Sequence, residues 1–179
     1  MKFQIAASTA LIVFFGLVAP SLSQSNDPEA REMFLEGTSD TCQGCDLSSV
    51  TLSPDPEDWQ RYHNVKLRQT NLQGATLADL DLRGSYFSCA DLSGADLSGA
   101  NLSNVDFFYA NLSGANLSGA DLSAATFRGA IVDETTNLDG VILSEDTIAP
   151  NSQFAQTTGS MASVQPVPLD GRTCFGRPE

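Results

Sequence analysis

The sequence has few basic residues and a single histidine. Its 9 lysines and arginines stand against 22 aspartates and glutamates, so the formal net charge at pH 7 is −13. A chain this acidic is repelled by phosphate backbones and by anionic lipid surfaces. We therefore expect no direct binding to nucleic acid or to a membrane surface.

The sequence also lacks the residue patterns that indicate catalysis or cofactor binding. Its only histidine, His63, has no partner that the sequence defines. No segment resembles a nucleophile elbow, a phosphate-binding loop or a set of metal ligands. Serine and aspartate are abundant, but they recur at fixed positions of a repeat described below. The sequence therefore predicts a protein that is not an enzyme, with no catalytic residue, no cofactor and no metal site.

No apolar run is long enough to span a bilayer. The run from Ile5 to Val18 falls short of the roughly 20 residues that a transmembrane helix needs. Lys2 precedes it and small residues up to Ser23 follow it, which is the arrangement of a secretory signal peptide. We expect residues 1–23 to be removed, which changes the net charge from −13 to −14 because Lys2 is the only charged residue among them. The expected location is extracytoplasmic: the periplasm, a thylakoid-type lumen or the exterior, with no membrane span left after cleavage.

Cysteines number four: Cys42, Cys45, Cys89 and Cys174. In an exported protein an even number indicates disulfides, but four cysteines allow three pairings. The pair Cys42 and Cys45 forms a C-x-x-C that also fits a redox pair or half of a metal site. The redox interpretation lacks the βαβ context of such motifs, and the metal interpretation lacks a second C-x-x-C. A structural role is favoured, and a redox-responsive role stays open as an alternative.

An internal repeat of five residues dominates the chain from Val65 to Glu134. A period of five fits neither a helix nor a plain strand, but it fits a short extended piece followed by a corner. In units such as Ala95–Gly99, Ala and Leu share one face, Asp lies on the other, and Ser-Gly forms the turn. The fourteen central residues are Leu67, Leu72, Leu77, Leu82, Phe87, Leu92, Leu97, Leu102, Phe107, Leu112, Leu117, Leu122, Phe127 and Val132.

The spacing of the three central phenylalanines predicts how the units stack. Phe87, Phe107 and Phe127 each stand four pentapeptides after the last, so four units per coil would align them as an interior ladder. Small alanines at the other inward position fit a narrow interior. The sequence therefore predicts a four-sided solenoid whose core is formed by aligned leucine, alanine and phenylalanine side chains.

The pattern A-[DN]-L-S-G, seen at Ala90–Gly94, Ala95–Gly99, Ala110–Gly114 and Ala115–Gly119, resembles the pentapeptide-repeat family. The match covers about seventy contiguous residues, and the signal peptide makes the chain similar to an exported, cyanobacterial-like member. The resemblance implies an all-β fold, a right-handed quadrilateral β-helix. It also agrees with the start at Cys42 and Cys45, where a cysteine pair precedes the first repeat in many such domains.

The ends of the solenoid are expected to differ from its body. Residues 24–44 form an N-terminal cap region with a short helix at Pro28–Glu36, which begins with an Asx N-cap and proline and ends at Gly37. The β-helix is expected over residues 45–143, with the regular block 65–134, an insertion at 55–64, and repeats that resume one residue out of phase after 133–135. Residues 144–179 are expected to be a flexible tail, into which Cys174 introduces a possible tether.

One surface feature departs from the repeat. Phe108 and Tyr109 replace the usual Ser-Gly after Phe107, and Tyr86 lies on the same side one coil earlier. Exposed aromatic residues on a small, polar face indicate a partner-contact patch, although packing of the tail explains them equally well. The leading functional hypothesis is a structural or protein-interaction module whose partner is unknown. A second copy of the chain is one candidate partner. An acidic DNA mimic that binds topoisomerase is an alternative, which export from the cytoplasm disfavours.

Overall fold

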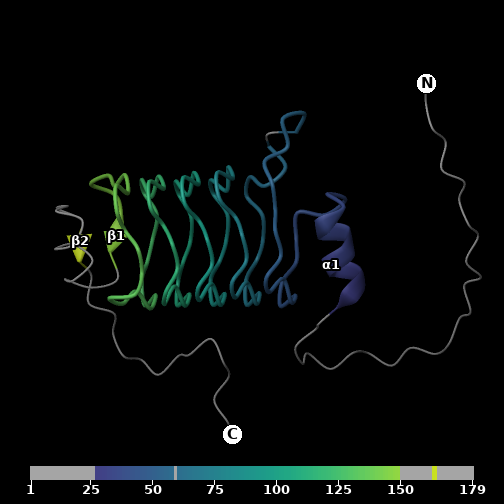
Figure 1. The fold of residues 1–179 in the computed structure, drawn as a ribbon, viewed down its shortest axis with the longest axis horizontal. Coiled ribbons are helices and arrows are strands. Elements are labelled where there is room, and N and C mark those ends of the chain that lie inside the picture. Colours follow the sequence, from purple (N-terminus) through teal and green to yellow (C-terminus); the bar gives the residue numbers. More distant parts are fainter. Residues whose placement is uncertain (1–26, 59, 150–162, 165–179) are drawn as a thin grey trace, which may run out of the picture.

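The computed structural model of the protein describes residues 27–58, 60–149 and 163–164. In this part of the chain the named elements are one helix, α1 (Pro28–Leu35), and two short strands, β1 (Ile148–Ala149) and β2 (Ser163–Val164). Between α1 and β1 the chain winds into stacked coils, with α1 at one end and the strands at the other (Figure 1). The predicted signal peptide lies outside the described residues.

The coils are joined by parallel β-bridges at one residue of each pentapeptide. Through the regular block each bridge joins equivalent residues of units four pentapeptides apart, as between Lys66 and Tyr86 or between Asn71 and Asp91. One coil therefore holds four pentapeptides, in agreement with the spacing of the central phenylalanines. Because each unit contributes a single bridged residue, its extended piece is too short to form a named strand.

The first coil is one pentapeptide longer than the others. The bridge from Thr41 to Lys66 spans five units instead of four, so the coil begins at Thr41, before the predicted start at Cys45. The Asn64 N–H donates to the Arg83 carbonyl at 3.0 Å, and Tyr62 is buried at the central position of its unit. Residues 60–64 therefore belong to the coil, and the predicted insertion 55–64 is shortened to residues 55–59.

The coils continue past the regular block after a one-residue shift. The bridge from Asn116 to Asn137 spans four pentapeptides and one additional residue, as the sequence predicted. The Thr136 hydroxyl donates to the Leu112 carbonyl at 2.9 Å, and the buried Thr147 hydroxyl repeats this contact with the Leu122 carbonyl at 3.0 Å. Residues 144–149 thus extend the coils, which corrects the prediction that the flexible tail begins at residue 144.

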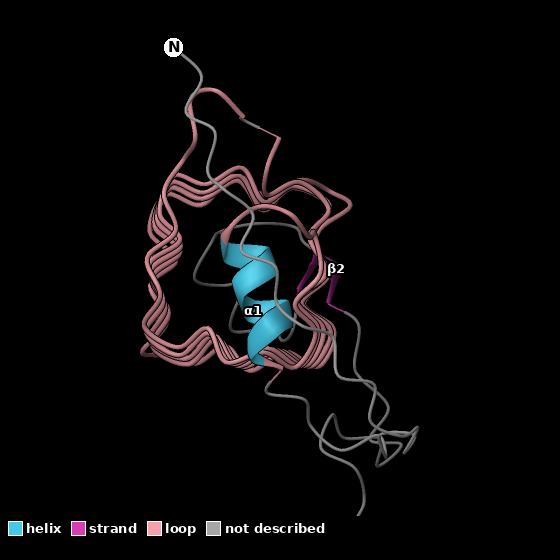
Figure 2. Cartoon of the chain, turned by 90° about the vertical axis from the view of Figure 1, so that its right-hand side faces the viewer, coloured by secondary structure: helices cyan, strands magenta, loops and turns pink. Residues whose placement is uncertain are grey.

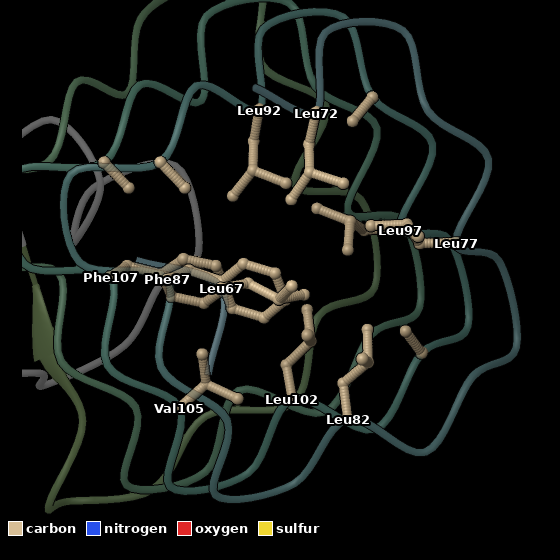
Figure 3. Packing of buried hydrophobic residues seen from close by; sticks show 14 of the residues in the cluster. Leu67, Leu72, Leu77, Leu82, Phe87, Leu92, Leu97, Leu102, Val105 and Phe107 are labelled. Carbon is tan, nitrogen blue, oxygen red and sulfur yellow. The ribbon is translucent and has the colours of Figure 1, made fainter. Parts of the chain in front are cut away.

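Aligned apolar side chains fill the interior. Leu72 lies beside Leu92, and the ring of Phe87 lies beside that of Phe107 (Figure 3). The ring of Phe127 continues this stack. The ring centroids of Phe87 and Phe107 are 5.6 Å apart, and those of Phe107 and Phe127 are 4.9 Å apart. All three rings are fully buried. The alanines at the other inward position of each unit are small, so the backbone can lie close to the aligned leucine and phenylalanine side chains and the interior is close-packed.

The outward Asp and Asn residues hold the corners together. Asp96 Oδ1 accepts the Ser98 N–H two residues later at 3.1 Å, and the same arrangement recurs around the coils. The side-chain amide of Asn116 then donates to Asp96 at 3.0 Å in the neighbouring coil. In this set of bridged residues at equivalent positions of successive coils, an Asn follows the Asp, so two carboxylates do not lie one coil spacing apart.

Helix α1 covers the open N-terminal end of the coils (Figure 2). Asp27 begins the helix, because its Oδ1 accepts the Glu29 N–H at 3.0 Å and Pro28 follows at the first helical position. The helix ends one residue before the predicted end. The Phe34 residue of α1 is 2% exposed, and the centroid of its ring lies 6.5 Å from the centroid of the Tyr62 ring. The cap thus closes the interior with apolar contacts and shields the first coil from end-to-end association.

Candidate protein interaction surface

Three aromatic side chains, Tyr86, Phe108 and Tyr109, form what we call the aromatic strip. Tyr86 bridges to Asp106 in the next coil, and Phe108 and Tyr109 follow Asp106 closely on that coil. The strip therefore covers two adjacent coils on the wall whose inner side carries the phenylalanine stack. Tyr86 is 38% exposed and Phe108 is 39% exposed, whereas Tyr109 is half-buried.

Contacts with neighbouring side chains give the strip a defined geometry. The rings of Phe108 and Tyr109 meet edge to face, with centroids 4.5 Å apart and planes at 81°. The Arg68 guanidinium lies 5.2 Å from the centroid of the Tyr86 ring, within range of a cation–π contact. Tyr109 lies over Gly129, where an added Cβ atom would come within 2.8 Å of the ring. The wall thus presents aromatic faces and an arginine in fixed positions.

The corners of this wall hold residues that the backbone geometry disfavours. Cys89 and Tyr109 occupy successive coils at the corner position, with φ angles of 63° and 54°. Glycine fills this position in many other units, because the left-handed region costs an L-residue about 1 kcal/mol or more. Side chains retained at such positions point to a role other than folding. Cys89 is disulfide-bonded, and the predicted candidate Cys174 lies outside the described residues.

The C-x-x-C pair lies in the first coil, two coils before Tyr86, because Thr41 bridges to Lys66 and Lys66 bridges to Tyr86. Cys42 and Cys45 form a disulfide and are 0% and 1% exposed. Thr70, which is also buried, donates its hydroxyl to the Cys42 carbonyl at 2.7 Å. Both sulfurs belong to the apolar interior of the first coil, so a reductant reaches them only if this end of the coil opens. This placement supports a structural role.

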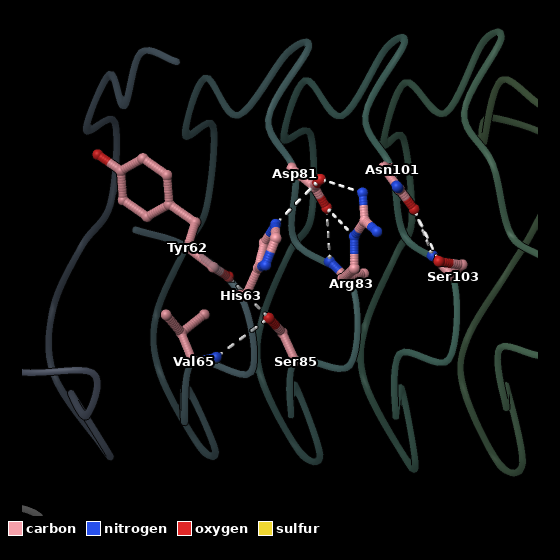
Figure 4. A network of polar contacts seen from close by, with 8 residues as sticks. All are labelled: Tyr62, His63, Val65, Asp81, Arg83, Ser85, Asn101 and Ser103. Carbon is pink, nitrogen blue, oxygen red and sulfur yellow. Dashed lines mark hydrogen bonds and ion pairs between the residues drawn. The ribbon is translucent and has the colours of Figure 1, made fainter. Parts of the chain in front are cut away.

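A polar network around His63 was not foreseen from the sequence (Figure 4). His63 Nε2 lies 3.0 Å from Asp81 Oδ2, and Arg83 also donates to Asp81. Partial burial tends to raise the pKa of Asp81, but hydrogen bonds from Arg83 and His63 outweigh it and lower the pKa below its usual value. Ser85 donates its hydroxyl to the Tyr62 carbonyl at 3.1 Å. These contacts fasten residues 60–64 to the next coil.

The repeat itself contains the signal for this network. The register of four pentapeptides per coil places Tyr62 beside Leu82 and His63 beside Arg83, so Asp81 lies within reach of the imidazole. The sequence predicts that the regular block begins at Val65, which places His63 in the insertion. If the block is extended by one unit to residue 60, the repeat register predicts the contact of His63 with Asp81.

The described residues form neither a metal-binding cluster nor a membrane-spanning helix. Within residues 27–58, 60–149 and 163–164, no group of three or more His, Cys, Asp or Glu side chains is placed to hold a metal ion. No helix in this part of the chain has the length and apolar character to cross a membrane. The acidic side chains of the repeat are instead engaged at the corners, as at Asp96 and Ser98.

A model of pentapeptide repeats matches eight copies, over residues 66–104 and 100–136. Residues 66–136 of this chain are pentapeptide repeats, the repeat that defines the pentapeptide-repeat family. Proteins of this family form right-handed β-helices and generally serve as structural or interaction modules. A search of curated proteins finds no match.

Solved structures of other pentapeptide-repeat proteins are similar to this chain. The protein Rfr23 from the cyanobacterium Cyanothece 51142 is 26% identical, with 69% of this chain and 98% of that chain covered and a TM-score of 0.30. A pentapeptide repeat protein from the Arabidopsis thaliana thylakoid lumen is 28% identical, with coverages of 58% and 62% and a TM-score of 0.32. The plasmid-mediated fluoroquinolone resistance protein QnrB1 is 16% identical, with coverages of 60% and 54% and a TM-score of 0.37. These TM-scores are low.

Proposed function

We propose that this pentapeptide-repeat protein is an exported, non-catalytic interaction module that binds another protein through the aromatic strip. Residues 1–23 would direct it to the periplasm, a lumen or the exterior. Its body, we infer, is a right-handed quadrilateral β-helix. Support for the four sides comes from the register of four pentapeptides per coil and from the outline of the coils seen end-on (Figure 2).

The exposure of the strip carries the proposal. Tyr86 and Phe108 each leave more than a third of their surface accessible, at repeat positions where many other units carry Asp, Asn or Ser. Folding alone does not require aromatic residues there, since Ser-Gly completes the same corner at Ser113 and Gly114. Tyrosine, phenylalanine and arginine are enriched at protein interfaces, where rigid rings bury much area at little entropic cost. The strip and Arg68 supply all three residue types.

A matched pair of variants tests the proposal. The mature protein is used to capture binding proteins from its own extracytoplasmic fraction, and the affinity for each purified candidate is then measured. We expect Phe108→Ser/Tyr109→Gly to weaken binding at least tenfold, about 1.4 kcal/mol or more, because it removes both rings while restoring the common corner residues. The control Ile142→Thr removes an exposed apolar side chain from another wall and should leave the affinity unchanged.

Other results would locate the interface on a different surface. If Phe108→Ser/Tyr109→Gly still binds but Ile142→Thr does not, the interface lies outside the aromatic strip. Self-association of the native protein and of Phe108→Ser/Tyr109→Gly is measured by sedimentation, since a second copy of the chain is also a candidate partner. The acidic DNA-mimic hypothesis receives less support, because export separates the chain from cytoplasmic topoisomerases and carboxylates such as Asp96 are engaged in corner hydrogen bonds.

A further inference from the structure

We propose that the aromatic strip binds an extended acidic segment of a partner protein, which runs across the coils and places carboxylates on Arg68 and Arg128. The inference rests on the proposed interaction function and deepens it by naming the chemistry of the partner. Its test uses defined peptides, so it can fail independently of that function.

The wall that carries the aromatic strip differs in charge from most of this acidic molecule. On this wall, the bridged position of each unit and the position two residues later hold three cationic residues and one carboxylate: Lys66, Arg68, Arg128 and Asp106. The same two positions on the next wall along the chain hold three aspartates and no cationic residue: Asp46, Asp91 and Asp133. A chain with a net charge of −13 therefore gathers positive charge beside its exposed aromatic rings.

Backbone hydrogen bonds align the two arginines along the wall. The N–H that follows Arg68 donates to the Ser88 carbonyl at 3.0 Å, and the N–H that follows Ser88 donates to the Phe108 carbonyl at 2.8 Å. The N–H that follows Phe108 donates to the Arg128 carbonyl at 3.0 Å. Three coil spacings of about 4.8 Å thus separate the arginines by roughly 14 Å, with the rings of Tyr86 and Phe108 on the two coils between them.

Neither arginine has a carboxylate partner among the described residues. Three ion pairs occur in this part of the chain, and all involve other residues: His63 with Asp81, Arg83 with Asp81, and Lys66 with Asp40. Arg128 is exposed, and the exposed Arg68 is held 5.2 Å from the centroid of the Tyr86 ring. A guanidinium group binds a carboxylate through two parallel N–H donors, so each arginine offers a site for one acidic side chain.

The other charges near the strip do not cancel this attraction. Asp106 accepts the Ser88 hydroxyl at 2.6 Å and the Phe108 N–H at 3.0 Å, so both of its carboxylate oxygens are engaged within the wall. Lys66 is paired with Asp40 at 3.0 Å. Charges on the other walls act more weakly, because exposed charges are screened over about 8 Å at physiological ionic strength.

The backbone of the wall is already paired, so recognition depends on side chains. Parallel bridges join Lys66 to Tyr86, Tyr86 to Asp106, and Asp106 to Thr126. Between these coils the backbone groups are used by neighbouring coils, so a partner strand cannot add to an edge here.

The spacing of the arginines favours an extended segment. In an extended chain, side chains at i, i+2 and i+4 point to the same face, and positions i and i+4 lie roughly 13 Å apart. Acidic residues at i and i+4 therefore match Arg68 and Arg128, and an aromatic residue at i+2 falls between the rings of Tyr86 and Phe108. The same span on a helix takes about ten residues and leaves the two carboxylates on different faces.

Fluorescence anisotropy with labelled peptides tests the site on the full mature chain. The probe is Gly-Glu-Thr-Phe-Thr-Glu-Gly with blocked termini. One control peptide replaces both glutamates with glutamine, and the other, Gly-Glu-Thr-Phe-Glu-Thr-Gly, turns the second glutamate to the opposite face. We expect the probe to bind with a dissociation constant below about 1 mM and both controls to bind about tenfold more weakly. A weaker dissociation constant for the probe, or equal binding of the probe and either control, would overturn the proposal.

A matched pair of protein variants locates the site. Arg68→Gln/Arg128→Gln removes both charges from the wall, whereas Arg83→Gln removes one charge from a different wall, and circular dichroism confirms that both variants are folded. We expect the double variant to bind the probe about tenfold more weakly and to lose its salt dependence, and Arg83→Gln to bind it unchanged. Unchanged affinity in the double variant, or an equal loss in Arg83→Gln, would place the peptide elsewhere and refute the assignment.

The inference and the proposed function fail in different ways. If a captured protein is lost in Phe108→Ser/Tyr109→Gly but binds Arg68→Gln/Arg128→Gln as tightly as the native protein, the interaction function stands and the acidic segment falls. If the probe binds through both arginines but no captured protein depends on the strip, the acidic-peptide site stands and the interaction function falls.

Discussion

The phenylalanine stack offers the most direct test of how this β-helix is stabilised. Phe107 is fully buried between the rings of Phe87 and Phe127, with centroids at 5.6 Å and 4.9 Å, whereas among the described residues Phe87 stacks on the ring of Phe107 alone. Replacing either residue with leucine keeps an apolar side chain of the kind found at most central positions. The two substitutions differ chiefly in the number of ring contacts that they remove.

The expected magnitudes follow from these contacts. An aromatic pair contributes about 0.5–1.5 kcal/mol beyond its buried area, so Phe107→Leu should cost about 1–3 kcal/mol and Phe87→Leu about half as much. Phe107→Ala loses about 2 kcal/mol of transfer free energy, and its lost ring contacts are counted within the cavity term. An unrelaxed cavity of ~100 Å³, at ~24 cal/mol per Å³, adds about 2.4 kcal/mol. The alanine variant should therefore lose about 4 kcal/mol.

Urea unfolding followed by circular dichroism measures these differences. The m-values of the native and variant proteins must agree, because a stack of repeats can lose cooperativity and fray from one end. Equal losses for Phe87→Leu and Phe107→Leu would refute the argument that ring contacts determine the cost. A loss below about 2 kcal/mol for Phe107→Ala would show that neighbouring coils collapse into the space.

Three further predictions concern the polar contacts of the coils. Hydrogen bonds from Ser98, opposed by partial burial and aided by Asn116, lower the pKa of Asp96. The contribution of the Asp96 carboxylate to folding stability is therefore complete above the unfolded pKa of about 3.9 and is lost as pH falls through the folded pKa. The midpoint of urea unfolding should therefore shift to lower urea concentration below pH 4. Asn116→Asp should cost about 0.5–1 kcal/mol at pH 7, because it replaces an amide donor with a like charge, and the loss should shrink at pH 3. Thr136→Val should cost about 1–3 kcal/mol in chemical unfolding by leaving the Leu112 carbonyl without its hydroxyl donor, whereas Thr136→Ser should cost less. Undiminished stability of the valine variant, or an unchanged urea midpoint at pH 3, would contradict the respective contact.

Much of the architecture was predictable because each residue of the repeat has one geometric role. The interval of four pentapeptides between Phe87 and Phe107 gave the length of the coil, and the shift after Asp133 was visible as a break in phase. Prediction failed where a side chain of another type took a repeat position. Tyr62 fills the central position of its unit, but its neighbours lack the usual alanine and glycine, so the sequence pattern predicts an insertion at this unit.

The candidate surface was only partly predictable, for a different reason. Sequence spacing placed Tyr86, Phe108 and Tyr109 on one wall, because the corner position and the coil length are fixed by the repeat. It did not determine ring directions, such as the packing of Tyr109 over Gly129, since these depend on rotamers of neighbouring coils. Nor did it choose the partner of Cys89, because three pairings satisfied the sequence equally.

In a repeat fold, residues that break the repeat at a cost are the best guide to function. Among the described residues, eight other than glycine have positive φ, and three of them are Asn or Asp, which tolerate this conformation well. The other five are Ser49, Gln69, Cys89, Tyr109 and Ala124. Cys89 and Tyr109 differ from the rest of these five in their position. They occupy the same corner position on adjacent coils and flank Phe108, which leaves an apolar ring exposed. Three unfavourable choices at neighbouring positions are difficult to explain by folding, whereas a surface that contacts another protein accounts for exposed aromatic rings in fixed positions.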